Sequence, residues 1–411
     1  MGIPVLLLLT GATLLNYVDR GSLAIAAPLL QSPLGLSDGQ MGVLLSAFFW
    51  TYAPTQLLAG WLVHRFDVRY VLAGGVALWS LATAFTGLAG GFASLLMFRL
   101  LLGAGESVTF PASQLLVARH IANEDRGRAN GLIGASQGVG PMLGTLFSGW
   151  LMIQYGWRAL FVGLGAVTLL WVWPWLAASR RGPLEHTAHV EPDHVSYAAI
   201  LSRRPFWGAA LGHFCCNYSF YFFITWLPTF LVKAGGFTLA EMTQLGALIY
   251  GIYAASAAIA GAWSDQWLKR GASTTRVRKT FAVIGVVGPA VMSLVCAFVS
   301  PRDAVWFLGA SGLLMGFATP MMFTIGTTLA GPRAAGRWFG AQNLSGQCAG
   351  ILAPLVTGFT VQVTGHFYWA FLVTAAVSLL GVLGWGVLVE QVEPVQWREE
   401  DTLLPEPRVT A

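Results

Sequence analysis

Four ionisable residues lie inside long apolar stretches of the first quarter of this sequence: Asp19, Arg20, Arg99 and Glu106. An ionised group at the centre of a membrane helix costs roughly 2.5–3.5 kcal/mol on insertion scales, so such residues usually face water or one another and carry function. Two acids and two bases in this setting predict an ion-coupled binding site. The alternative is two structural ion pairs that hold helices together.

Arginine and carboxylate side chains supply the chemistry that an ion-coupled anion carrier needs. A guanidinium stays charged and binds a carboxylate through two parallel hydrogen bonds. A carboxyl group nearby can exchange a proton, because low dielectric and a neighbouring arginine act on its protonation in opposite directions. Arg99 and Glu106 are almost two helical turns apart, so both should project from one helix face, about 10 Å apart. Asp19 and Arg20 are adjacent and should point about 100° apart.

The elements that position these residues are membrane-spanning helices. Of the 411 residues, 55% are hydrophobic and 10% are charged, and a span needs about 20 apolar residues. We predict an all-α membrane protein with twelve spans in two six-helix halves. The predicted spans are 3–31, 40–63, 70–91, 93–120, 129–153, 158–178, 206–232, 241–263, 280–299, 304–330, 337–362 and 367–389.

The distribution of positive charge predicts the orientation of these spans. Most Lys and Arg residues outside the spans fall in the even-to-odd loops and the C-terminal tail, while Arg158, Lys233 and Arg302 fall in the odd-to-even loops. Positively charged loops stay cytoplasmic, so both termini should be cytoplasmic in a plasma (inner) membrane. The net charge of +5 reflects this bias, and no basic patch with interleaved aromatic residues indicates a nucleic-acid partner.

The longest hydrophilic break divides the sequence into two halves that resemble each other. We predict an N-terminal bundle over 1–178, a cytoplasmic central loop over 179–205, a C-terminal bundle over 206–390 and a cytoplasmic tail over 391–411. Glycine-rich segments recur at equivalent places in the two bundles. Internal repeats of this kind build many transporter folds, with the substrate site near the midplane between the halves.

The whole chain resembles the major facilitator superfamily, whose loop signature is Gly-x-x-x-Asp-Arg-x-Gly-Arg-Lys. The second span ends with Gly60 and Arg65, but His64 replaces the signature Asp, whereas the eighth span keeps Gly261 and Asp265. The resemblance implies that these five residues gate the cytoplasmic side. His64 is expected to weaken the N-terminal copy of this gate, because neutral histidine replaces a carboxylate that pairs with arginine and with a helix N-terminus.

Within the superfamily the chain resembles the anion:cation symporters. The match lies in Asn16-Tyr17-Val18-Asp19-Arg20, in the segment from Arg99 to Glu106 with Phe110-Pro111, and in Trp226-Leu227-Pro228-Thr229. The resemblance implies that Arg20 binds the substrate carboxylate. It also implies that Asp19 and Glu106 carry protons and are linked through Arg99. The further substrate-binding residues that it implies are Tyr17, Tyr52, Gln137 and Asn343.

The second half lacks the intramembrane charges of the first. Aligning Gly103 with Gly316 places Gly312 opposite Arg99 and Thr319 opposite Glu106. We therefore expect the N-terminal half to couple protons and the C-terminal half to shape specificity. His213 in the seventh span could titrate near neutral pH, but a core histidine satisfied by a neighbour is the better interpretation.

These patterns predict a secondary active transporter that imports a small organic anion with protons by alternating access. Sugar acids such as aldonates, uronates or aldarates are the expected substrates. The alternatives are another monocarboxylate or an aromatic acid, an exporter of drugs or amphiphiles, and a sensor that has lost transport. No Walker loop, nucleophile elbow or zinc motif is present, so no enzyme, cofactor or metal is expected. The expected partners are the anion, protons and the lipid bilayer, around a monomer.

Overall fold

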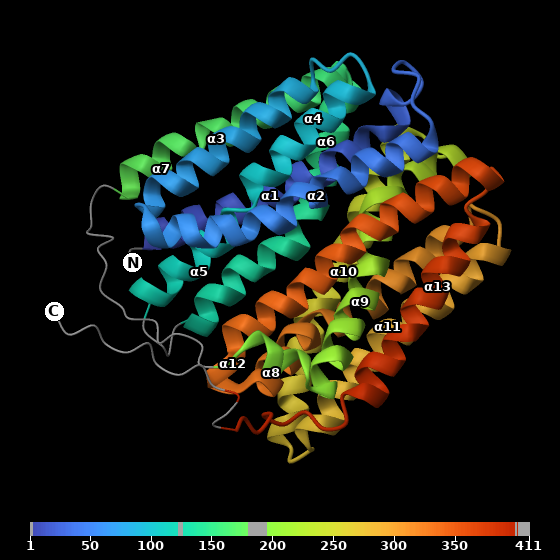
Figure 1. Cartoon of the computed structure of the whole chain (residues 1–411). Helices are drawn as coiled ribbons and strands as arrows, with labels where there is room; N and C mark the ends of the chain where they lie inside the picture. The colour runs from blue at the N-terminus through green and yellow to red at the C-terminus, as the bar shows by residue number, and fades with distance from the viewer. Residues whose placement is uncertain (1–2, 122–125, 180–194, 399–400, 402–411) are drawn as a thin grey trace.

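The computed structural model describes residues 3–121, 126–179, 195–398 and 401, and this part of the chain is helical, with no β-strand (Figure 1). The first half contains α1 (Ile3–Leu30), α2 (Asp38–Arg65), α3 (Val68–Thr86), α4 (Phe92–Glu106), α5 (Thr109–His120), α6 (Arg126–Leu170) and α7 (Val172–Ser179). The second half contains α8 (Tyr197–Leu201), α9 (Arg204–Thr229), α10 (Leu239–Lys269), α11 (Thr274–Phe298), α12 (Ala304–Thr364) and α13 (Tyr368–Val382). The π-helical segments η1 (Phe230–Ala234) and η2 (Leu383–Leu388) extend α9 and α13.

Two of these helices are pairs of spans joined by a glycine. α6 changes direction at Gly156, where φ is 79°, and α12 does so at Gly331, where φ is 62°. Positive φ is strained for a residue with a Cβ atom, so glycine allows each turn to be made with no loop. The predicted fifth and sixth spans therefore lie in α6, with α7 completing the sixth. The tenth and eleventh lie in α12.

Nine stretches of the described residues are long and apolar enough to cross a membrane. One of them, 132–179, contains the turn at Gly156 and so holds two predicted spans. α1 and α2 are not among these stretches, but they are 28 residues long each and pack in the same bundle (Figure 1). The chain is thus an all-α, multi-pass membrane protein, and the arrangement is consistent with twelve spans.

The predicted fourth span, 93–120, is matched by one apolar stretch over 92–117, in which Ser107 and Val108 join α4 to α5. Glu106 ends α4, and the helix resumes at Thr109. Pro111 lacks the N–H that would reach back one turn to the Ser107 carbonyl oxygen, which weakens a helix at that point. The Ser107 hydroxyl donates to the Ala104 carbonyl oxygen at 2.7 Å. Ser107 and Val108 keep right-handed helical backbone angles, so the span continues past Glu106 with a weakened hydrogen-bond ladder.

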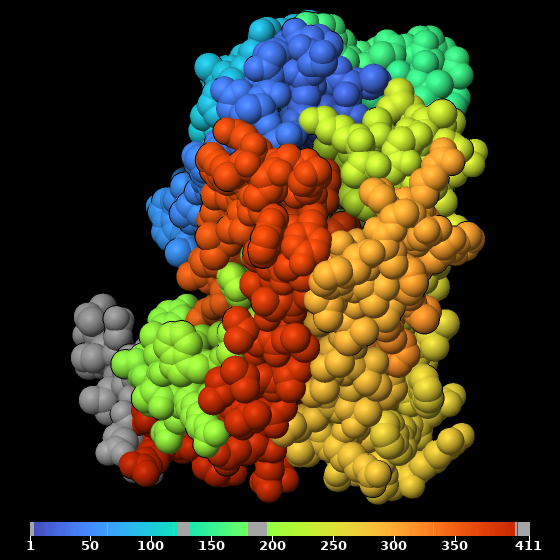
Figure 2. Space-filling model, turned by 90° about the vertical axis from the view of Figure 1, so that its right-hand side faces the viewer, coloured from blue at the N-terminus to red at the C-terminus, as the bar shows by residue number. Residues whose placement is uncertain are grey.

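The two halves pack mainly on themselves and meet along three helix pairs. α1 and α3 pack on α6, and α9 and α11 pack on α12; across the halves, α2 meets α12, α6 meets α10 and α1 meets α9. We call the end where α1 begins and η2 ends the terminal end, and the end where α1 joins α2 the distal end. Figure 2 shows the blue α1–α2 junction seated on the orange-red end of the α12 helix and the yellow-green start of α10.

The halves repeat each other at the level of single contacts. Thr51 Oγ1 of α2 donates to the Leu100 carbonyl oxygen of α4 at 2.7 Å, three residues before Gly103. Ser256 Oγ of α10 donates to the Leu313 carbonyl oxygen of α12 at 2.5 Å, three residues before Gly316. A Cβ atom on either glycine would lie under 3.0 Å from the partner helix. The alignment of Gly103 with Gly316 is therefore confirmed, and each glycine allows its two helices to approach closely.

The described part of the tail binds the C-terminal half at the terminal end. Val395 N–H donates to the Leu329 carbonyl oxygen at 2.9 Å, and Trp397 Nε1 donates to the Ala330 carbonyl oxygen at 3.0 Å, beside the turn at Gly331. Asp401 pairs with Arg203 at 2.6 Å, just before α9. The backbone N–H of Arg398 and the Arg203 guanidinium lower the pKa of Asp401. The tail thus joins the central loop to the turn between the tenth and eleventh predicted spans.

Candidate functional site

A cavity lies between the two halves and is lined by helices of both. It encloses about 800 Å³ of empty space, with its open mouth included. All five residues expected to bind substrate line it: Arg20, Tyr17, Tyr52, Gln137 and Asn343. Its remaining lining residues are Gln56, Phe110, His213, Cys216, Asn217, Phe220, Tyr221, Tyr253, Met315, Thr319, Met322, Phe323, Phe339 and Gln347. Arg20 is the one Arg or Lys residue among these lining residues.

Arg20 is held on the N-terminal wall of this cavity by one partner on its own helix and one on α4. Its Nη2 donates to Asn16 Oδ1 at 2.9 Å, one helical turn earlier, and to Glu106 Oε2 at 3.2 Å. The guanidinium carbon lies 4.8 Å, 4.6 Å and 4.8 Å from the ring centroids of Tyr17, Phe48 and Tyr52. Aromatic faces attract a desolvated cation, so the group is fixed while its other N–H groups stay available to a ligand.

Glu106 forms the one intramembrane ion pair that the described residues contain. Its side chain is fully buried, and Oε1 has no hydrogen-bond partner among the described residues. A buried ion pair is weakly stabilising as a whole, because desolvation of both charges offsets their attraction. Protonation of Glu106, or arrival of a second carboxylate at Arg20, would therefore rearrange this pair.

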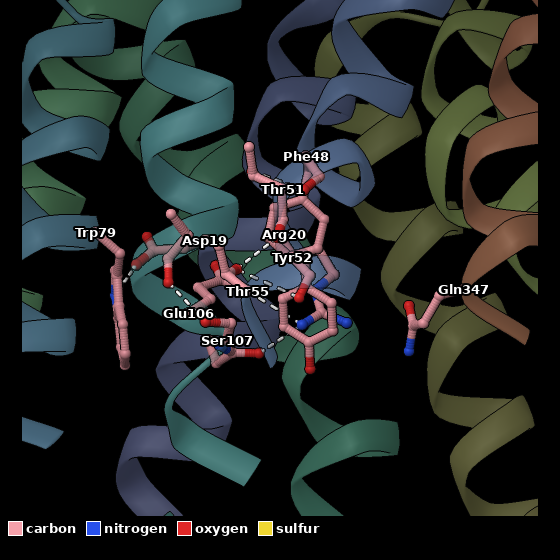
Figure 3. Close-up of polar contacts among 12 residues, drawn as sticks. Asp19, Arg20, Phe48, Thr51, Tyr52, Thr55, Trp79, Glu106, Ser107 and Gln347 are labelled. Atoms are coloured by element: carbon pink, nitrogen blue, oxygen red, sulfur yellow. Dashed lines mark hydrogen bonds and ion pairs between the residues drawn. The ribbon is translucent and has the colours of Figure 1, made fainter. Parts of the chain in front are cut away.

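Asp19 points away from the cavity, toward the third and sixth predicted spans. Its Oδ2 accepts from Trp79 Nε1 at 3.0 Å and from Thr168 Oγ1 at 3.3 Å. Its Oδ1 has no partner within the described part of the chain. Figure 3 shows the Asp19 side chain turned to Trp79, on the side of Arg20 away from Gln347. Asp19 and Arg20 thus point into two different environments, as expected from the 100° between adjacent residues of a helix.

Arg99 is buried without direct contact to either acid. Its Nε donates to the Leu44 carbonyl oxygen at 3.3 Å, and its guanidinium carbon lies 5.7 Å from the Phe48 ring centroid. No carboxylate of a described residue lies within 4.0 Å of it. A direct link from Arg99 to Asp19 and Glu106, which the family resemblance implied, is thus absent from this conformation. The Phe48 ring lies near both Arg20 and Arg99, a contact that no sequence pattern indicates.

The C-terminal wall of the cavity carries polar side chains among apolar ones, and none of its lining residues is Arg, Lys, Asp or Glu. Tyr221 OH donates to Gln347 Oε1 at 3.4 Å, and Tyr253 and Thr319 share a hydrogen bond of 3.0 Å. Thr319, the position aligned with Glu106, lines the cavity with Asn343.

His213 also lines the cavity and is 2% exposed. Its interpretation as a core histidine satisfied by a neighbour is correct for one ring nitrogen only, because Nδ1 is bonded to Gln342 and Nε2 has no partner among the described residues.

The expected gating residues differ between the two copies of the loop signature. Asp265 Oδ1 accepts from Arg278 Nη2 at 3.0 Å, which ties α10 to α11 near Gly261. In the N-terminal copy, Gly60 has open space beside it and Arg65 is exposed. The His64 side chain lies outside the described residues.

Asp67, which stands where the signature has its second glycine, caps α3 and pairs with Arg69 at 2.5 Å. Arg69 Nη1 in turn donates to the Ser179 carbonyl oxygen at 3.3 Å. This carboxylate therefore holds the start of α3 near the end of α7.

The distal end of the interface between the halves is closed by backbone contacts. A Cβ atom on Gly42 would lie 2.6 Å from the Pro354 carbonyl oxygen and 3.1 Å from the Gly358 Cα atom. Gly39 N–H donates to Gln362 Oε1 at 2.9 Å, and Lys233 pairs with Asp38 at 2.8 Å. α2 and α12 can approach this closely because neither Gly42 nor Gly358 carries a side chain.

We expect Gly42→Ala to open the distal end. Overpacking of a close contact costs about 1–3 kcal/mol, so the population closed at this end should fall about five- to a hundredfold relative to the open one. Spin-label distances between Ser32 and Val363, which are exposed on the two halves, measure the change. Gly74→Ala is the control, because its Cβ atom would meet open space. An unchanged distance distribution in Gly42→Ala would contradict this account of the closure.

The family model that matches this chain is the Major Facilitator Superfamily, over residues 9–347 and 271–408. A bacterial homolog of the human lysosomal transporter Spinster, in an inward-facing and unoccupied conformation, has the same fold, with a TM-score of 0.79, 19% identity and 98% of each chain covered.

The names of similar proteins indicate which kind of transporter this chain resembles. The chloroplastic ascorbate transporter of Arabidopsis thaliana is 30% identical over 93% of this chain and 74% of its own length. The probable sulfoacetate transporter of Cupriavidus necator is 28% identical over 89% of each chain. The probable galactarate/D-glucarate transporter of Bacillus subtilis is 27% identical over 95% of this chain and 92% of its own. The chain is thus a transporter and not an enzyme, and it belongs to the Major Facilitator Superfamily, among the anion transporters of that family.

Proposed function

We propose that this protein imports a small organic acid, with a sugar acid as the preferred class, by proton symport. The observation that carries the proposal is the position of Arg20, the one cationic side chain on the described wall of the cavity, paired with a buried Glu106. Three relatives are named as transporters of ascorbate, of sulfoacetate and of galactarate or D-glucarate, which supports an organic anion as substrate.

The Arg20–Glu106 pair supports coupling of the anion to a proton. A substrate carboxylate and the Glu106 carboxylate compete for one guanidinium, and two anions beside one cation are unfavourable in a low dielectric. A proton on Glu106 removes this conflict and frees Arg20 for the substrate. Asp19, buried beside Trp79 and Thr168, is the second proposed proton site, and Arg99 sets the electrostatic field of both acids.

The packing of the halves supports transport by alternating access. We propose that 1–178 and 206–390 move as two bundles about the cavity, joined by the loop over 179–205, with the tail over 391–411 on the same side of the membrane. The backbone contacts of Gly42 and Gly358 close the distal end. With both termini cytoplasmic in the plasma (inner) membrane, this conformation is the inward-facing one of a monomer, and Gly261, Asp265, Gly60, His64 and Arg65 belong to the opposite gate.

A thermal-shift screen of the purified protein against organic acids tests the substrate class. A ligand at 100 times its Kd adds about 2.7 kcal/mol of stability, so aldonates, uronates and aldarates should raise the melting temperature, while neutral hexoses should not. The rings of Phe110, Phe220, Phe323 and Phe339 on the cavity wall favour an aromatic monocarboxylate as the second candidate. Stabilisation by cationic amphiphiles and by no acid would contradict the proposal and indicate a drug exporter.

A further inference from the structure

Two neighbours of Gln342 determine which atom of its side-chain amide is the oxygen and which is the nitrogen. Its Oε1 accepts from Trp338 Nε1 at 3.1 Å, and its Nε2 donates to the Met322 carbonyl oxygen at 3.1 Å. An indole N–H can only donate and a carbonyl oxygen can only accept. The amide therefore cannot be reversed without placing two donors together and two acceptors together.

This orientation decides which nitrogen of His213 carries the proton. Gln342 Nε2 is 3.2 Å from His213 Nδ1. Because the amide nitrogen of Gln342 can only donate, His213 Nδ1 must accept. The neutral imidazole ring of His213 then carries its proton on its own Nε2 atom. A doubly protonated ring would place an N–H of Nδ1 against the N–H of Gln342, so the amide holds His213 in its neutral form.

The Nε2–H group of His213 is the end of this chain of hydrogen bonds that lies at the cavity. The side chain is 2% exposed and lines the cavity, and Nε2 has no partner among the described residues. Gly346 on α12 leaves room for it, since a Cβ atom there would lie 2.8 Å from His213 Nε2 and 2.5 Å from Asn217 Nδ2. Nε2 is not among the fully enclosed polar atoms that lack a partner, so it is open to the cavity, where a ligand or water can accept its hydrogen bond.

The charges of the cavity limit what this donor can bind. Arg20 lies on the N-terminal wall, whereas the polar residues that line the C-terminal wall beside His213 are neutral: Asn217, Thr319, Asn343 and Gln347. A substrate with its carboxylate at Arg20 meets hydrogen-bonding groups but no cation at its other end. A second carboxylate there would be desolvated without a counter-charge.

We propose that His213 is a specificity-determining residue that donates its Nε2–H to a hydroxyl oxygen of the substrate, so that the site selects a polyhydroxylated monoacid over a diacid. This inference rests on the proposed function, because it requires the substrate carboxylate at Arg20. It narrows the substrate to the aldonate and uronate type and excludes the dianionic aldarate type as the preferred ligand.

Two substitutions of His213 separate its two nitrogens. Asn places an acceptor oxygen near the Nδ1 position and keeps the bond from Gln342, but it removes the donor at the cavity. Gln places an N–H donor near the Nε2 position. A neutral hydrogen bond contributes about 0.5–1.5 kcal/mol, so His213→Asn should weaken the binding of D-gluconate about three- to tenfold, while His213→Gln should stay within about threefold of the wild type.

The test measures dissociation constants of D-gluconate, D-glucarate and hexanoate for the purified wild type and both variants. Hexanoate carries the carboxylate but no hydroxyl, so its affinity should be the same in His213→Asn as in the wild type. Gluconate should bind the wild type at least tenfold more tightly than glucarate. Equal weakening of gluconate and hexanoate in His213→Asn would assign His213 a merely structural role and overturn the proposal, as would tighter binding of glucarate by the wild type.

The same measurements on Arg20→Lys distinguish failure of this inference from failure of the proposed function. If Arg20→Lys weakens all three acids while His213→Asn weakens none, the anion site stands and the role of His213 is wrong. If the wild type binds none of the acids, the proposed function fails and the inference fails with it.

Discussion

Arg20→Lys is expected to lower the affinity for the transported acid about ten- to a hundredfold. Hydrogen bonds to charged groups contribute about 1.5–3 kcal/mol, and lysine loses the planar fork that binds a carboxylate through two bonds. It also loses the flat contact with Tyr17, Phe48 and Tyr52, whose ring centroids lie 4.6–4.8 Å from the guanidinium carbon. The charge is retained, so the substitution isolates geometry from electrostatics.

Arg158→Lys is the matched control for this prediction. Arg158 also lies over an aromatic ring, 4.4 Å from the Trp157 centroid, and it donates to the carbonyl oxygens of Gly87 and Ala89, neither of which lines the cavity. Binding measured by titration calorimetry should be unchanged in the control. Equal affinity in the wild type and Arg20→Lys would show that Arg20 does not hold the substrate carboxylate.

Glu106→Gln is expected to abolish uptake driven by a pH gradient while leaving exchange of substrate for substrate. Glutamine mimics the protonated acid, so Arg20 stays free for the anion in every step of the cycle, but no proton can be released. One pH unit corresponds to about 1.4 kcal/mol, or tenfold accumulation of a monoanion with one proton. Uptake in proteoliposomes with an imposed pH gradient should therefore fall about tenfold, to the equilibrium level.

Counterflow exchange is the internal control, because it needs no net proton movement. Glu241→Gln is the matched substitution, since Glu241 is an exposed acid that caps α10 at Thr238 and lies outside the cavity. Asp19→Asn should share the loss of pH-driven uptake if Asp19 is the second proton site. Accumulation by both Glu106→Gln and Asp19→Asn under a pH gradient would remove the acids from the coupling mechanism.

Sequence alone predicted the fold and the N-terminal wall of the cavity well. Helix spacing separates the directions of Asp19 and Arg20, and the structure turns Asp19 to Trp79 while Arg20 lines the cavity. The alignment of Gly103 with Gly316 is matched by equivalent hydrogen bonds in both halves. These features depend on helical periodicity and on small residues at helix contacts, both of which a sequence displays.

The partners that long side chains reach on neighbouring helices could not be predicted from the sequence. Arg99 bonds to the Leu44 carbonyl oxygen, not to an acid, because the register of α4 against α2 decides what its long side chain reaches. The nitrogen of His213 that faces the cavity could not be predicted, since Gln342, which bonds to the other nitrogen, Nδ1, is 129 residues away in the sequence. The weakened helix between α4 and α5 had a visible signal in Pro111, one turn beyond Ser107.

We propose that the anion and the proton are transported together through the Arg20–Glu106 pair. Proteoliposomes that contain a pH-sensitive dye, with equal pH on both sides, test it most directly when the sugar acid that binds best is added outside. The lumen of wild-type vesicles should acidify as labelled acid enters, and Glu106→Gln vesicles should exchange labelled acid with no acidification. Entry of the acid into wild-type vesicles without a change in lumenal pH would contradict it.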